Sequence, residues 1–121
     1  MHKKYYVLIL KDKDLMKTLL PKASKDYQNL DVAILHKAVF EHILNLSPEE
    51  QASGSKVDFV KGNKETLKKL EDKKYSFGFL VNPPLMKEVF ATARNGEVMP
   101  QKSTYFYPKV FSGIVIYSLE E

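Results

Sequence analysis

Four short apolar segments, separated by stretches with helical periodicity, constrain the fold of this chain most strongly. They span residues 5–10, 57–60, 75–81 and 113–119, and they are rich in the β-branched and aromatic residues that favour strands. Strands that alternate with helices are typical of a helix layer packed on a sheet. The sequence therefore predicts an α/β fold on the border of α+β: a two-layer sandwich with a mixed sheet of about four strands and three or four helices.

Helical periodicity is clearest after Asp31, which we expect to cap the main helix. Apolar residues recur there at spacings of three and four, and they form one stripe for packing on the sheet. The stripe consists of Val32, Leu35, Val39, Ile43 and Leu46. Three shorter helices are expected at 15–20, at 64–72 after the cap residue Asn63, and from Pro83-Pro84 to the stop at Asn95-Gly96.

The connections between these elements are polar. Residues 22–29 are expected to be a polar connector, and residues 47–55 a polar loop that can open with a helical turn. The sequence as a whole shows no repeat, low-complexity tract or interdomain linker. We therefore expect a single domain over residues 1–121.

The distribution of charge argues against nucleic acid as the main partner. The chain has 19 basic and 15 acidic residues and a formal net charge of +4. Arg94 is its single arginine, although arginine is the residue best suited to guanine and to two-pronged contacts with phosphate. The lysines alternate with acids over most of the chain, as on a solvated surface. Weak nucleic-acid binding is therefore only the third candidate function.

Neither export nor membrane association is expected. The chain has no cysteine, which excludes disulfides and thiolate chemistry. The apolar run at 5–10 is too short to span a bilayer, and the charged residues 11–14 follow it in place of a signal-peptide cleavage site. We expect a cytoplasmic protein.

One segment near the C-terminus departs from the charge pattern, because residues 98–119 contain two lysines and no acid. Within it, an ammonium group, two hydroxyls and two phenol rings occur at Lys102, Ser103, Thr104, Tyr105 and Tyr107. Such groups suit an anion, and Asn82 adds a polar side chain where a predicted strand passes into a helix. We predict a polar pocket for a small anionic or phosphorylated ligand; the alternative is a non-catalytic protein-interaction or scaffolding domain in which this segment only closes the sheet.

The same segment resembles a known family. Residues 99–109, followed by Ser112-Gly113 and an apolar strand, are similar to the terminal signature of the domain-of-unknown-function 1015 family. The positions 30–36, Asn82-Pro83 and Gly96 agree with it, so the resemblance covers essentially the whole chain.

The resemblance implies a partner. Members of this bacterial and archaeal family are longer, and their N-terminal part carries an Asp-Gly-His-His-Arg type motif on a fold similar to that of ParB and sulfiredoxin. The chain contains no such motif, since its histidines are His2, His36 and His42. It therefore looks like the C-terminal region of such a protein, and the N-terminal region becomes an expected partner.

Catalytic and metal-binding residues are not expected in this chain. His36 and His42 are six residues apart on the main helix, so they cannot ligate a metal together as an i, i+4 pair does. His36 lies beside the apolar stripe, where a hydrogen-bonded boundary residue is the ordinary interpretation. No nucleophile–base pair and no glycine-rich phosphate loop is visible, so we predict no cofactor and do not expect catalysis by this chain alone.

Overall fold

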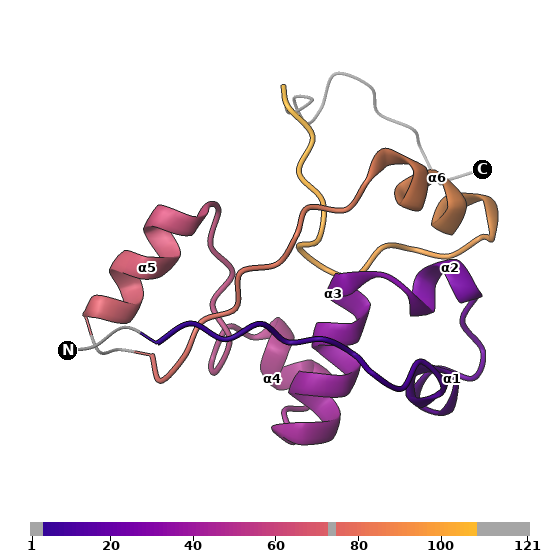
Figure 1. Cartoon of the computed structure of the whole chain (residues 1–121). Helices are drawn as coiled ribbons and strands as arrows, with labels where there is room; N and C mark the ends of the chain where they lie inside the picture. The colour runs from indigo at the N-terminus through magenta and orange to yellow at the C-terminus, as the bar shows by residue number, and fades with distance from the viewer. Residues whose placement is uncertain (1–3, 73–74, 109–121) are drawn as a thin grey trace, which may run out of the picture.

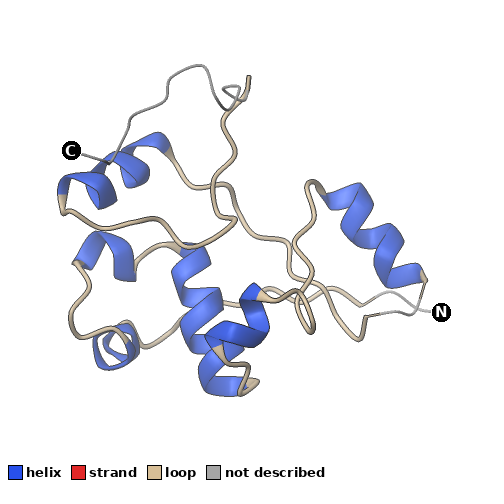
Figure 2. Cartoon of the chain, turned by 180° about the vertical axis from the view of Figure 1, so that it is seen from behind, coloured by secondary structure: helices blue, strands red, loops and turns tan. Residues whose placement is uncertain are grey.

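The computed structural model describes residues 4–72 and 75–108, and this part of the chain is helical (Figure 1). In chain order its elements are α1 (Asp14–Leu19), α2 (Lys25–Gln28), α3 (Asp31–Ile34), the π-helix η1 (Leu35–Ile43), α4 (Pro48–Ala52), α5 (Asn63–Glu71) and α6 (Met86–Arg94). α3 and η1 are continuous and form a central helix, against which α1 and α2 pack, while α2 also contacts α6. α5 lies apart from the other helices and is joined to them by extended chain (Figures 1 and 2).

The predicted α/β sandwich is wrong, because the described residues contain no β-strand (Figure 2). The segments 5–10, 57–60 and 75–81 form no backbone ladder with one another, and the fourth predicted strand, 113–119, lies outside the described residues. Strand propensity reports how well a side chain fits a pleated surface that neighbouring strands must supply. Residues 75–81 pack against α5 instead, where Leu70 Cδ1 lies 3.0 Å from the position that a Cβ would take at Gly78.

The central helix starts where the sequence predicts but does not keep the α-helical period. Over Leu35–Ile43 it is a π-helix, whose hydrogen bonds reach back five residues in place of four. Each residue then advances by a smaller angle around the axis, so the buried face shifts. Ala38 and Phe40 are buried, whereas Ile43, which the predicted stripe placed toward the core, is 65% exposed.

Two short helices occupy the predicted connections. In α2, Ser24 is the N-cap: its Oγ accepts a hydrogen bond from the Tyr27 amide at 3.2 Å and donates one to Glu97 Oε2. The Ser24 amide also donates to Glu97 Oε1 at 2.7 Å. These bonds tie α2 to the chain that follows α6.

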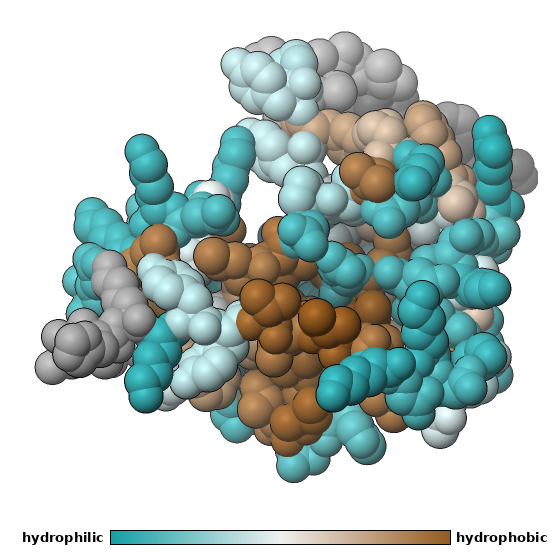
Figure 3. All heavy atoms as spheres, viewed as in Figure 1, coloured by the Kyte–Doolittle hydropathy of each residue, from teal (hydrophilic) through white to brown (hydrophobic). Residues whose placement is uncertain are grey.

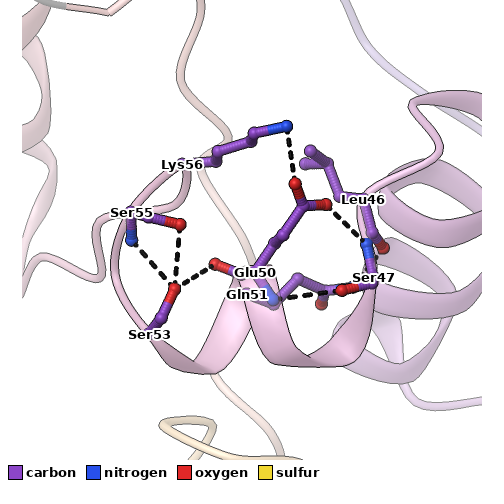
Figure 4. A network of polar contacts seen from close by, with 7 residues as sticks. All are labelled: Leu46, Ser47, Glu50, Gln51, Ser53, Ser55 and Lys56. Carbon is purple, nitrogen blue, oxygen red and sulfur yellow. Dashed lines mark hydrogen bonds and ion pairs between the residues drawn. The ribbon is translucent and has the colours of Figure 1, made fainter.

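α4 begins at a capping box, shown in Figure 4. Ser47 Oγ accepts a hydrogen bond from the Glu50 amide at 3.2 Å, and the Ser47 amide donates to Glu50 Oε2 at 3.0 Å. Lys56 Nζ lies 2.6 Å from Glu50 Oε1 and, with the Ser47 amide, holds the pKa of Glu50 below its ordinary value. The box thereby fixes the start of α4 and the position of Gln51 on it.

α6 ends as the sequence predicts. Its last residue is Arg94, and Gly96 has a φ of +72°, the left-handed conformation that glycine adopts readily after a helix. None of the helices within residues 4–72 and 75–108 has the length and apolar character that crossing a lipid bilayer requires.

The core is small for a chain of this length. In the described part, the buried residues are the apolar Met16, Leu30, Ala33, Ala38 and Phe40 and the polar Gln51 and Thr92. By contrast, the five consecutive residues from Tyr5 to Ile9 are between 67% and 87% exposed. In Figure 3 an apolar patch occupies the centre of the face that the N-terminal segment crosses in Figure 1. Contiguous exposed apolar surface is common at sites where proteins bind partners or ligands.

Candidate functional site

A cavity of 370 Å³ lies between the central helix, α5 and the extended segments 56–60 and 75–84. Its volume is within the range of about 300–1,000 Å³ that is usual for ligand pockets. Aliphatic side chains and prolines of these elements form much of its wall, and we call it the apolar groove. Its aromatic side chains are His36, Phe40, Phe59, Tyr75, Phe77 and Phe79.

The aromatic rings of the apolar groove support one another. Phe59 stacks on His36 with a centroid distance of 5.9 Å and an interplanar angle of 9°. Phe40 meets His36 edge to face at 5.4 Å, and it meets Phe79 in the same manner at 5.5 Å. Edge-to-face and offset arrangements are those that aromatic quadrupoles favour. His36 is thus held by one ring of the central helix and one ring of the segment 56–60.

The His36 ring is oriented by Gln51, the buried residue that α4 positions. Gln51 Nε2 donates a hydrogen bond to the Leu46 carbonyl at 3.1 Å, so the amide oxygen Oε1 faces the His36 ring. His36 Nδ1 lies 2.7 Å from that oxygen and therefore carries the hydrogen. In the neutral ring Nε2 is then an acceptor, and no described residue donates a hydrogen bond to it. His36 is hydrogen-bonded, as expected from the sequence.

Three lysines line the apolar groove, and two of them are paired. Lys56 binds Glu50, and Lys69 Nζ donates to Asp58 Oδ2 at 2.6 Å, a hydrogen bond that raises the pKa of Lys69. The Tyr75 hydroxyl donates to the same oxygen at 2.5 Å. The third lysine is Lys102, which forms no ion pair with any residue of the described ranges.

The structure brings together half of the residues that the sequence singles out. Asn82, Lys102 and Ser103 line the apolar groove, whereas Thr104, Tyr105 and Tyr107 are not among its lining residues. Tyr105 lies beneath another lysine, since Lys61 Nζ is 3.8 Å from the centroid of its ring. Tyr107 is 86% exposed. The consecutive positions 102–107 therefore do not form one continuous pocket wall.

Two of the three predicted residues in the groove use their hydrogen-bond donors within the protein. Ser103 Oγ donates to the Pro100 carbonyl at 2.5 Å, and Asn82 Nδ2 donates to Asp31 Oδ2 at 3.0 Å. The prediction that Asp31 caps the central helix is wrong, because Leu30 takes the N-cap position. Lys102 alone keeps its charge unpaired by a described residue, and its φ of +59° places it in the left-handed region.

Sequence reasoning missed the aromatic lining of the groove. Phe77 and Phe79 alternate in sequence, which signals a shared face, but Phe40 lies off the predicted stripe and Phe59 sits in a segment of four residues. In the described ranges, no group of three or more His, Asp or Glu side chains is arranged to hold a metal ion.

Comparisons with known proteins found no family model that matches the chain, and no curated protein or solved structure with significant similarity to it. The resemblance to the domain-of-unknown-function 1015 family therefore stays a prediction.

Proposed function

We propose that this chain is a non-catalytic protein-interaction domain whose apolar groove receives an apolar side chain from an extended segment of a partner protein. The groove itself carries the proposal: it is a space of 370 Å³ with many aromatic and aliphatic side chains in its wall. Only five apolar side chains are buried in the described part of the chain. Covering the groove would therefore add substantially to the apolar surface removed from water.

The charges on the groove specify the partner further. Lys56 and Lys69 are already paired with Glu50 and Asp58, whereas Lys102 is the groove lysine that forms no ion pair with a described residue. A carboxylate beside the apolar side chain of the partner would complement it. The N-terminal region of a longer protein is one source of such a segment, and a cytoplasmic location belongs to this proposal.

A pocket for a small anionic or phosphorylated ligand is the second candidate, because Asn82, Lys102 and Ser103 line the same groove. Its support is weaker, since the hydroxyl of Ser103 and the amide of Asn82 already donate to protein acceptors. The carboxylate of Asp31 next to Asn82 also repels an anion. Nucleic-acid binding has less support still, because it needs several free cations.

An NMR titration with 3-phenylpropionate and its neutral amide, 3-phenylpropionamide, tests the proposal. We expect both compounds to shift the backbone amide signals of Leu35 and Gly78 in the groove. Only the carboxylate is expected to shift Lys102, with an affinity about two- to fivefold higher than that of the amide. Lys102→Gln should remove this difference. Lys87→Gln, an exposed lysine on α6 that does not line the groove, should preserve it.

Two outcomes would contradict the proposal. In the first, neither phenyl compound shifts Leu35 or Gly78. In the second, inorganic phosphate shifts residues 102–104 while the phenyl compounds leave the groove unchanged, which would favour the small-anion pocket.

A further inference from the structure

His36 adds a hydrogen-bond acceptor to a groove that is otherwise largely apolar. We propose that the partner side chain that enters the apolar groove is a tyrosine, and that its phenol hydroxyl donates a hydrogen bond to His36 Nε2. This inference rests on the proposed interaction function and names the chemistry that the same site recognises. It follows from three properties of His36: its tautomer, its aromatic surroundings and an Nε2 that accepts no hydrogen bond from a residue within 4–72 or 75–108.

The tautomer follows from a buried amide. Gln51 is 4% exposed, and both ends of its side-chain amide are engaged, one by the Leu46 carbonyl and the other by His36 Nδ1. Reversing the amide would place its NH₂ against His36 and its oxygen against a carbonyl, losing the bond to Leu46. The structure therefore keeps the hydrogen on Nδ1 and the lone pair of the neutral ring on Nε2.

The surroundings of His36 favour an aromatic guest. Phe40 and Phe59 contact the His36 ring, and Phe79 contacts Phe40, so an entering ring would find aromatic faces and edges. A guest without a donor would cover His36 and leave Nε2 without a hydrogen bond in a dry environment, which is unfavourable. A guest with a donor avoids this loss.

A phenol fits the polar groups of the groove better than an indole does. The phenol oxygen can donate to His36 Nε2 and accept from a lysine, whereas an indole N–H only donates. Lys102 is a groove residue with no ion pair in the described ranges, so the wall of the groove also carries an ammonium donor. Tyrosine is therefore the side chain that matches both groups.

Titration with p-cresol, toluene and indole tests this inference. The ratio of the p-cresol affinity to the toluene affinity is expected to fall about tenfold in His36→Phe, which keeps an aromatic ring but removes the acceptor. The matched control is His42→Phe, because His42 is an exposed histidine of the same helix that does not line the groove. In the wild-type protein, p-cresol should also move the ¹⁵N signal of His36 Nε2, and toluene should move it less.

The outcomes separate this inference from the proposed function. The inference is overturned if the affinity ratio is the same in the wild type and His36→Phe, or if p-cresol leaves the His36 Nε2 signal unmoved while it shifts Leu35 and Gly78. Tighter binding of indole than of p-cresol overturns the choice of tyrosine. If none of the three compounds shifts Leu35 or Gly78, the proposed function itself fails. The wild-type signal decides the question even if His36→Phe does not fold.

Discussion

At the residue scale, Ser47 determines where α4 begins. Its hydroxyl accepts from the Glu50 amide, and its own amide donates to the Glu50 carboxylate. Replacement by alanine removes one of these bonds, so we expect Ser47→Ala to lower the free energy of unfolding by about 1 kcal/mol. Urea denaturation monitored by circular dichroism measures this. Ser55→Ala is the control, because the Ser55 hydroxyl accepts a hydrogen bond from Ser53 within a turn and takes no part in the capping box; an equal loss in both variants would contradict the capping role.

Single residues also show where local sequence patterns suffice and where they fail. The Ser-x-x-Glu spacing at Ser47 is a local signal for a helix start, and the structure places a helix there. Asp31 has an equally good local signal, yet its carboxylate binds Asn82, which is 51 residues away in the sequence. The cap position passes to Leu30. A local pattern cannot contain that long-range contact, and the pairing of His36 with Gln51 was missed for the same reason.

At the element scale, η1 shows how a correct helix assignment can give a partly wrong buried face. The apolar spacing after Asp31 predicts a helix, and a helix is present. The predicted stripe, however, assumes the α-helical period. In a π-helix successive side chains are separated by a smaller angle, so a different set of side chains faces the core. Phe40, which lies off that stripe, is 6% exposed, and through it the π-helix contributes an aromatic ring to the apolar groove.

Two substitutions on η1 distinguish the π-helical register from an α-helical one. Phe40→Ala is expected to lower the free energy of unfolding by about 3–5 kcal/mol, because it empties a buried site. Ile43→Lys is expected to change it by less than about 0.5 kcal/mol, since the side chain is 65% exposed. Thermal and chemical denaturation of both variants measures these values. A large loss in Ile43→Lys would mean that Ile43 faces the core, as a regular α-helix requires.

At the scale of the whole molecule, the sequence predicted the positions of the longer helices better than the architecture. Helices at 15–20, 64–72 and after Pro84 agree with α1, α5 and α6 to within a residue or two. The strand predictions within the described residues were wrong, because an apolar β-prone segment forms a strand only when another strand lies beside it. Whether such a neighbour is present depends on the tertiary structure. In the described part, the segments that were predicted as strands line the groove or lie exposed.

The exposed N-terminal segment, residues 5–9, has a further consequence for the molecule as a whole. Its side chains are at least 67% exposed, and its backbone makes no hydrogen bond with the described residues. Such a segment resembles an unprotected sheet edge, which promotes association with other chains. We expect association that increases with protein concentration in sedimentation velocity experiments. Val7→Lys should reduce the associated fraction severalfold, because a charge in the segment opposes strand pairing.

Val98→Lys is the matched control for this experiment. Val98 is 85% exposed and Val7 is 87% exposed, so both substitutions add the same charge at sites of nearly equal exposure. If association depends on the N-terminal segment, Val98→Lys should leave the associated fraction close to that of the wild type. An equal reduction in both variants would assign the effect to net charge, which rises by one from +4 in each. A wild-type protein that stays monomeric at every concentration would show that residues 5–9 do not associate despite their exposure.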